Sequence, residues 1–516
     1  MLQIIIAVEV LRHMECPGYR MANFYFIGAY LASVFLCATA ADASNETTKP
    51  NIVFVFIDDW GYSDVGFRNP AVKTPNFDML ARTGLILDRH YVFKLCSPSR
   101  ASLLTGRWPH HVHQFNMRPH TPLGTNSNMM MLPAKLKLAG YDTHIVGKWH
   151  QGFVEKKFLP VNRGFDTSFG ILNGVGDHMN QFRRCATDMW MNHAPDGRNG
   201  TYSSYLYRDE LSQIFANRQS NDTPMFLYFA PQNVHSPFQA PEEWLNIYPK
   251  NSTCDFRRTY QAMVSVVDNV TGHIVELLKH YDMWDNTIMI ISSDNGAAPC
   301  KGSNYPLKGA KATFFEGGVR ALAFANGGLL PDKIRGKTTK GFIHIADWYT
   351  TFCNLAGVDP SDSGPGKFPV DGVDVWPILT GENTTSPHKE IILGYNYNNK
   401  GAIIVGDYKL IVGAQGAYCN RAMHSPLNYP CEAVANDIDC SPYCLYNIID
   451  DPEERNELSE AEPQKLQELL LHYDEYSKEP RHMQDLGFHS EQELPKFADV
   501  CKYMNDHGGY WQPWEG

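Results

Sequence analysis

The stretch Asn51-Ile52-Val53-Phe54-Val55-Phe56-Ile57-Asp58-Asp59 decides the fold of this 516-residue chain. Its β-branched and aromatic residues do not alternate with polar ones, which predicts a strand buried on both faces. The apolar run then ends abruptly in two aspartates. Three further apolar runs end in polar residues in the same way: 143–146 before Gly147-Lys148-Trp149-His150, 225–230 before Gln232-Asn233-Val234-His235, and 287–291 before Asp294-Asn295-Gly296.

Segments with helical periodicity separate these strands, at residues 74–84, 132–140, 205–217 and 257–280. Strands that alternate with helices predict an α/β fold, with one large, mostly parallel sheet covered by helices on both faces. Ligands bind beyond the carboxyl ends of the strands in such sheets. The four strand ends should therefore bring acids, an amide, a lysine and two histidines to one edge.

A smaller α+β domain is expected toward the C-terminus. Before it, the sequence predicts a helix at 343–357, a Pro/Gly/Ser-rich stretch at 359–369 and a polar segment at 381–388. The smaller domain itself has predicted short strands at 390–395, 401–405 and 408–412, a helix at 462–476 and an aromatic tail at 508–514. A boundary near Ser386 divides the chain into a main domain at 50–386 and a C-terminal domain at 387–516.

The N-terminus has the pattern of an export signal. Residues 24–41 are mostly apolar, follow Arg12 and Arg20, and end in the small-x-small pattern Ala38-Thr39-Ala40. We expect a signal peptide over residues 1–40, cleaved after Ala40, with an uncleaved signal anchor and a start at Met21 as alternatives. No later segment is long and apolar enough to span a bilayer.

Sequons and cysteines agree with a secretory route. Of the 12 cysteines, Cys16 and Cys37 lie in the leader, and the remaining ten could all pair in an oxidising compartment. Glycosylation is predicted at six N-x-S/T sequons: Asn45, Asn199, Asn221, Asn251, Asn269 and Asn383. A local disulfide group is predicted among four cysteines, with the connectivity left open: Cys419, Cys431, Cys440 and Cys444.

Charge and ligand chemistry narrow the function. The formal net charge of −11 argues against nucleic acid as a partner, although a local cluster of cations could still bind an anionic substrate. Asp58, Asp59, Asp294 and Asn295 offer only oxygen ligands, which predicts a hard divalent cation, calcium first and magnesium second. The alternative is that both pairs are only turns after strands.

The string Cys96-Ser97-Pro98-Ser99-Arg100, which continues as ASLLTGR to Arg107, predicts an anion site. Pro98 suits the first turn of a helix, so an anion near Cys96 would meet the free N–H groups of the helix N-terminus. Arg100 adds a fork of donors. The alternative for Cys96 is a disulfide or a buried thiol. Lys148, His150, His235 and Lys311 each have an ordinary reading as surface or core residues.

Taken together, these motifs resemble the sulfatase family from about Pro50 to the end of the chain. The resemblance rests on IDDWGYSDVG, CSPSRASLLTGR, GYDTHIVGKWHQG, RGFDTSFG, NVHSP, SSDNGA, KATFFEGGVR and DPEERNEL. It implies an alkaline-phosphatase-like fold and an arylsulfatase that releases sulfate from aryl or glycosaminoglycan esters. The FDTSFG and EGGVR contexts and the aromatic tail are most like the arylsulfatase B (N-acetylgalactosamine-4-sulfatase-like) branch.

The resemblance also implies roles for individual residues. Cys96 would be converted to formylglycine by the formylglycine-generating enzyme during secretion, to a lysosomal or extracellular destination. One calcium ion would be held by Asp58, Asp59, Cys96, Asp294 and Asn295. Arg100, Lys148, His150, His235 and Lys311 would be catalytic, and Lys148, His235 and Lys311 would also bind substrate. His235 would assist departure of the alcohol, and His150 would accept a proton as sulfate is released.

Two departures from the family pattern stand out. Gln151 replaces the leucine common after GKWH, and the loop at 108–131 has no cysteines, which deprives Cys501 of its usual partner. Two other functions fit the motifs: a phosphodiesterase or phosphonate hydrolase of the same superfamily, and a non-enzymatic secreted protein with the sulfatase fold. The sequence leaves the natural substrate and the oligomeric state open.

Overall fold

The computed structural model describes residues 48–218, 223–250, 254–365, 367–415, 417–419, 435–437, 439–478 and 494–515. The expected signal peptide and the sequons at Asn45, Asn221 and Asn251 lie outside this set. Asn199, Asn269 and Asn383 are exposed, although Thr271 in the sequon of Asn269 is fully buried, and glycosylation at all three stays a prediction. Residues 49–516 form one compact unit. None of the helices in the described ranges has the length and apolar character needed to cross a membrane.

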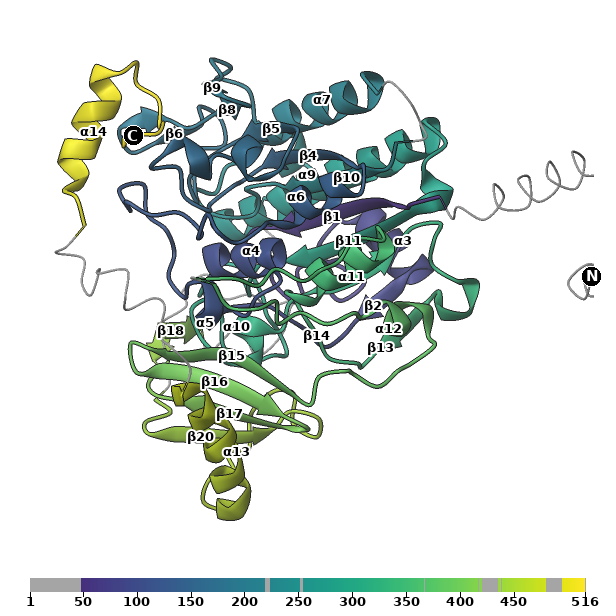
Figure 1. Ribbon diagram of the computed structural model, residues 1–516, viewed down its shortest axis with the longest axis vertical. Coiled ribbons are helices and arrows are strands. Elements are labelled where there is room, and N and C mark those ends of the chain that lie inside the picture. Colours follow the sequence, from purple (N-terminus) through teal and green to yellow (C-terminus); the bar gives the residue numbers. More distant parts are fainter. Residues whose placement is uncertain are drawn as a thin grey trace, which may run out of the picture. The chain divides into compact units, whose positions relative to one another are not determined.

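A ten-stranded sheet runs through the main domain (Figure 1). The four predicted strands are neighbours at its centre, in the order β11, β1, β10, β4, and all are mutually parallel. Of the ten strands, β12 and β8 run opposite to the central strands and the others run with them, which confirms the mostly parallel sheet. The order across the sheet is β13 (Lys337–Thr339), β2 (Leu85–Leu87), β12 (Ala323–Asn326), β11 (Thr287–Ser293), β1 (Asn51–Ile57), β10 (Met225–Ala230), β4 (Asp142–Gly147), β5 (Thr167–Gly170), β8 (Trp190–Met191) and β9 (Ala194–Pro195).

Helices cover both faces of this sheet, which explains the unbroken apolar run of β1. Phe54 and Phe56 pack on one face with α4 (Cys96–Thr105), α6 (Leu132–Leu138) and α11 (Asp347–Leu355). Val53 and Val55 pack on the other face with α3 (Pro75–Thr83), α7 (Ser203–Ala216) and α9 (Asp255–His280). All four side chains are fully buried, so neither face of β1 can carry a polar residue without a large desolvation cost.

Shorter elements connect this framework. The prediction of a helix at 343–357 is wrong at its start, because Ile343 and His344 form β14, which pairs with β3 (His90–Tyr91). The helix begins at Asp347, whose carboxylate accepts a hydrogen bond from the His344 N–H. The other short elements are α5 (Pro109–Val112), α8 (Glu242–Leu245), α10 (Glu316–Val319), α12 (Trp376–Thr380), η2 (Lys156–Phe158), η3 (Pro160–Arg163), η4 (Trp284–Asn286), η5 (Asp332–Ile334), β14 (Ile343–His344), β6 (Phe182–Arg183) and β7 (Ala186–Thr187).

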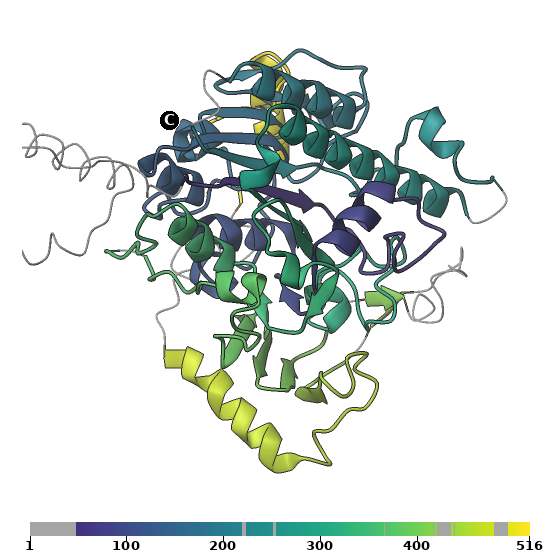
Figure 2. The same ribbon diagram turned by 90° about the vertical axis from the view of Figure 1, so that its right-hand side faces the viewer.

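A separate four-stranded antiparallel sheet follows the main domain, with α13 packed against it (Figures 1 and 2). Lys409 of this sheet is buried between the carboxylates of Glu316 and Glu454, at 2.8 and 2.7 Å, and so ties it to the main domain. The elements are β15 (Glu390–Tyr397), β16 (Lys400–Val405), β17 (Tyr408–Val412), β20 (Tyr443–Asn447), α13 (Pro463–Glu475), η7 (Tyr476–Lys478) and the small pair β18 (Ala417–Cys419) and β19 (Ala435–Asp437). The domain boundary near Ser386 stays a prediction.

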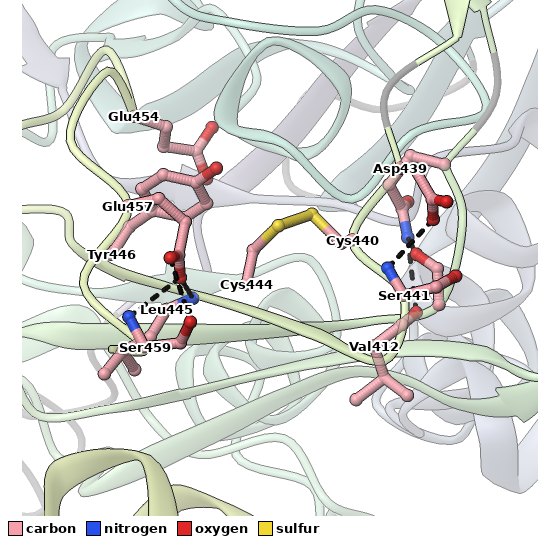
Figure 3. Close-up of a disulfide and its surroundings, with 12 residues drawn as sticks. Val412, Asp439, Cys440, Ser441, Cys444, Leu445, Tyr446, Glu454, Glu457 and Ser459 are labelled. Carbon is pink, nitrogen blue, oxygen red and sulfur yellow. Dashed lines mark hydrogen bonds between the residues drawn. A yellow bond between two sulfur atoms is a disulfide. The ribbon is translucent and has the colours of Figure 1, made fainter. Parts of the chain in front are cut away.

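Two disulfides are placed within the described residues. Cys440 and Cys444 pair at the start of β20 (Figure 3), whereas Cys431 and the side chain of Cys419 lie outside the described set. Cys501, in α14 (Phe497–Asp506), pairs with Cys185, 316 residues earlier. The missing cysteines of the 108–131 loop therefore do not leave Cys501 as a free thiol.

The C-terminal tail packs on the main domain rather than on the small sheet. Trp511 is fully buried, and its indole N–H donates to the Arg183 carbonyl at 2.9 Å. In return, the Trp190 indole N–H donates to the Trp511 carbonyl at 2.6 Å. Figure 1 shows α14 and the C-terminal end of the chain beside β6.

Candidate active site

The polar residues that follow the four central strands meet at one edge of the sheet. Asp58 and Asp59 follow β1, Lys148 and His150 follow β4, His235 follows β10, and Asp294 and Asn295 follow β11. One ligand atom from each of four residues, Asp58, Asp59, Cys96 and Asp294, lies within 4.8 Å of the others. The convergence expected from the strand pattern is therefore present in the fold.

Each carboxylate of this cluster is paired with a cation. Lys148 Nζ donates to Asp58 Oδ2 at 2.7 Å, and Lys311 Nζ donates to Asp59 Oδ1 at 2.6 Å. The third pair joins Arg100 Nη2 to Asp294 Oδ2, also at 2.7 Å. The formal charges of these three acids and three bases cancel, so a bound divalent cation would leave the site with a net charge of about +2, suited to an anionic substrate.

Two buried oxygens of the cluster have unused lone pairs. Asp58 Oδ1 and Asn295 Oδ1 accept no hydrogen bond from any described residue. A buried acceptor without a partner costs free energy unless a ligand satisfies it, and hard divalent cations prefer carboxylate and amide oxygens. The residues present therefore fit a metal ion of this kind.

Cys96 lies in the first turn of α4, because this helix begins two residues earlier than the predicted start near Pro98. Its Sγ lies 3.1 Å from Lys311 Nζ and 3.9 Å from Asp59 Oδ1. Burial, and then the negative charge of Asp294, raise the pKa of the thiol above its ordinary value. Cys96 forms no disulfide, which removes the alternative of a structural cystine.

The two histidines differ in what their ring nitrogens contact. His150 Nε2 lies 2.9 Å from the Met117 carbonyl, which can only accept, so this nitrogen carries the proton and the buried Nδ1 keeps a free lone pair. His235 Nδ1 donates in the same way to the Ser236 carbonyl at 2.7 Å, and its Nε2 lies 3.6 Å from Asp59 Oδ2. Burial and Lys148 lower the pKa of His150, and burial and Lys311 lower that of His235 to about 4.

The open side of the site is marked by side-chain exposure. The side chains of His235 and Lys311 are 19% and 13% exposed, whereas those of Arg100, Lys148 and Asp58 are 0% exposed. A substrate must therefore approach past His235 and Lys311, with its anionic end directed toward the buried pairs.

Gln151 has a larger part than its sequence suggests. Its amide donates to the carbonyls of Ser97 and His150, and its Oε1 accepts from Thr125. These bonds hold the loop after β4 against the start of α4. The sequence signal is an amide at a position where the resemblance implies leucine. Two of its partners, Ser97 and Thr125, come from segments that only the fold brings beside it.

A family model described as sulfatase matches residues 50–358, more than half of the chain. The chain belongs to the sulfatase family. Arylsulfatase J of Mus musculus is 35% identical over 91% of this chain and 81% of its own length. N-acetylgalactosamine-6-sulfatase of Homo sapiens is 34% identical over 65% of this chain and 67% of its own. The chain is accordingly a sulfuric ester hydrolase of a metal-dependent family; the arylsulfatase B branch stays a prediction.

Two solved structures share this fold. The crystal structure of Ps i-CgsB in complex with k-i-k-neocarrahexaose matches with a TM-score of 0.73 and 27% identity, over 88% of this chain and all of that one. The phosphonate monoester hydrolase of Agrobacterium radiobacter matches with a TM-score of 0.56 and 18% identity, over 83% of this chain and 95% of that one, which shows a shared fold alone.

Proposed function

We propose that this sulfatase releases inorganic sulfate from aryl or glycan sulfate esters, with Cys96 converted to formylglycine and one calcium ion as cofactor. The observation that carries the proposal is the buried cluster of three carboxylates and three cations around a cysteine that stands in the CSPSR string. The test is release of sulfate from 4-nitrophenyl sulfate, compared with release of 4-nitrophenol from its phosphate diester. A clear preference for the diester would contradict a sulfatase.

Asp58, Asp59, Asp294 and Asn295 would hold the calcium ion, together with the side chain at position 96. Bound there, the ion would screen the charge of the sulfate and lower the pKa of a hydroxyl beside it. The formylglycine aldehyde, when hydrated, would supply that hydroxyl as the nucleophile and a second one that allows the sulfate to leave.

The three cations are placed to hold the sulfate group. Arg100 and Lys148 are fully buried and fixed by their carboxylate partners, so their donors need little reorganisation when an anion enters. Lys311 is partly exposed and already contacts Cys96 Sγ, so it can follow the sulfate during transfer. Its pKa is raised above the ordinary value, against the effect of burial, by Asp59.

The histidines supply the proton transfers. His150 Nδ1 has a free lone pair and a lowered pKa, which suits a base that accepts the proton when sulfate is released. His235 lies at the open side, where the leaving alcohol must be, and Nε2 is its only nitrogen not engaged with a carbonyl. A bound sulfate ester is negative and so offsets the positive charge of Lys311. This raises the pKa of His235 and favours a proton on its Nε2.

Replacing His235 by alanine should slow esters with poor leaving groups most. A sugar alkoxide needs a proton to depart and nitrophenolate does not, so we expect kcat to fall by about 10²–10⁴-fold for a sugar sulfate and far less for 4-nitrophenyl sulfate. The measurement is kcat for both esters. His280→Ala, an exposed histidine at the end of α9, is the matched control. Equal losses on both esters would remove the proton-donor role from His235.

Burial of Cys96 supports modification during secretion. The thiol is 1% exposed and the whole of α4 is buried, so an enzyme could reach Cys96 only before the domain folds. This agrees with the proposed partner, a formylglycine-generating enzyme that acts as the chain enters the secretory pathway. The expected destination is the lysosome or the extracellular space, and the exposed sequons are compatible with that route.

A further inference from the structure

A pocket of about 590 Å³ is lined by Gly176 and Pro237, among other residues. Pro237 is two residues beyond His235 in the chain. Gly174, two residues before Gly176, lies close to His150, since a Cβ atom on Gly174 would be 2.4 Å from the His150 ring. The pocket therefore lies next to the side of the site where the leaving group must be.

Two adjacent arginines, Arg183 and Arg184, line this pocket. Neither forms an ion pair with a carboxylate in the part of the chain that the structure describes. The Arg183 Nε atom is buried and has no hydrogen-bond partner there. Burial, and then the charge of Arg184, lower the pKa of Arg183, and the charge of Asp188 opposes this shift only in part. The pair thus offers donors and positive charge to a ligand.

Asp177, the carboxylate among the lining residues, keeps its negative charge, but its oxygens are held by its own loop and by Gln239. Its Oδ1 accepts from the backbone N–H groups of Met179 and Asn180 at 2.8 and 2.7 Å. Its Oδ2 accepts from the Gln239 amide at 2.6 Å. Two guanidinium groups and this one carboxylate leave the lining with a net charge of about +1, and its other polar side chains are amides and one hydroxyl.

We propose that this pocket binds a second anionic group, a sulfate or a carboxylate, on the sugar next to the one that carries the scissile ester. Two guanidinium groups match such an anion in charge and geometry. Phe182 also lines the pocket and is 47% exposed, which gives an apolar ring face for the sugar itself. The preferred substrate is then an acidic oligosaccharide. The inference rests on the proposed function, because His235 sets the direction of the leaving group.

The arginines stand on a loop that is held in place before any ligand binds. Cys185, the next residue, is disulfide-bonded to Cys501, and the Trp511 indole donates to the Arg183 carbonyl. The guanidinium of Arg184 lies 5.0 Å from the ring centre of Phe497 in α14. A rigid loop loses little entropy on binding, so these contacts favour a preformed subsite.

The test compares two disaccharides. Both contain sulfated N-acetylgalactosamine, linked in one to glucuronic acid and in the other to its carboxyl-reduced counterpart. Wild-type enzyme should bind the acidic disaccharide about tenfold or more tightly, measured calorimetrically and as inhibition of 4-nitrophenyl sulfate hydrolysis. In the double variant Arg183→Gln/Arg184→Gln this preference should disappear. Phe182→Ala should weaken both disaccharides alike, because ring contact does not depend on charge.

Arg82→Gln is the matched control, since Arg82 is an exposed arginine on α3 and should leave all these values unchanged. Equal binding of the two disaccharides by wild-type enzyme, or a preference that survives in the double variant, overturns the subsite. Preferential binding without any sulfate release would contradict the proposed function and leave the subsite standing. Hydrolysis of 4-nitrophenyl sulfate without a preference for the acidic disaccharide would contradict the subsite and leave the proposed function standing.

Asn199 requires one further comparison, because it lines the pocket and begins a predicted sequon. A glycan there would compete for the same space. The preference for the acidic disaccharide should therefore be present both in the glycosylated protein and in Asn199→Gln. If it occurs only in Asn199→Gln, the natural occupant of the pocket is the protein's own glycan and the proposal is wrong.

Discussion

Replacing Cys96 by serine is expected to lower kcat for 4-nitrophenyl sulfate by at least about 10⁴-fold, the scale on which loss of a nucleophile acts. Serine has nearly the shape of cysteine and fits the first turn of α4, so the variant should fold. It cannot form a hydrated aldehyde, and so it lacks the second hydroxyl that releases the sulfate. Sustained turnover by this variant would falsify the formylglycine mechanism.

The matched control for this change is Cys353→Ser. Cys353 is a fully buried thiol in α11 that takes no part in the site, so its replacement reports the cost of a buried hydroxyl alone. Thermal unfolding should be similar for both variants, whereas only the Cys96 variant should lose activity. Mass spectrometry of the wild-type peptide that contains Cys96 should show a mass about 18 Da lower than that of the cysteine form, the difference between a thiol and an aldehyde.

Replacing Asp58 by asparagine should have the second largest effect, a fall in kcat of about 10²–10³-fold, because metal ions contribute several kcal/mol to stabilising charge in the transition state. Asparagine keeps the size of the side chain but removes the charge that pairs with Lys148 and leaves a weaker ligand at the unpartnered Oδ1 position. The affinity for Ca²⁺, measured by calorimetry, should fall with the activity.

The melting temperature of the protein gives an independent test of metal binding at the same site. A metal that binds only the folded state raises the melting temperature as its concentration rises. Added Ca²⁺ should therefore stabilise the wild-type protein and Asp88→Asn, a change at an acid outside the cluster that pairs with Arg320, but should have little effect on Asp58→Asn. If chelation of the metal leaves both activity and melting temperature unchanged, the cluster holds no functional ion.

The centre of the fold could be predicted because burial on two faces leaves an unmistakable pattern. After its first residue, Asn51, β1 is apolar at every position, and the polar residue that follows it marks the end at which the site forms. The positions of Asp58, Asp294 and His235 after strands therefore predict that these residues belong to the site. Residue type then indicated the hard-metal chemistry of the cluster.

The parts that sequence reasoning did not reach depend on contacts between distant segments. The antiparallel strand β12 is only four residues long, too short to show a period, and β14 takes residues that resemble the start of a helix. The pairing of Cys185 with Cys501 cannot follow from spacing, since any two cysteines are formally eligible. Arg183 and Arg184 look like ordinary surface charges until the pocket beside His235 is known.

The disulfide that joins α14 to the β6–β7 hairpin also has a consequence for the order of events during biosynthesis. Its two cysteines are separated by 316 residues, so at about 5–20 residues per second Cys501 is synthesised roughly 15–60 s after Cys185. During that interval Cys185 must stay reduced or exchange out of temporary partners. The disulfide that fixes the segment carrying Arg183 and Arg184 can therefore form only after translation is nearly complete. A chain that ends before Cys501 could not form it.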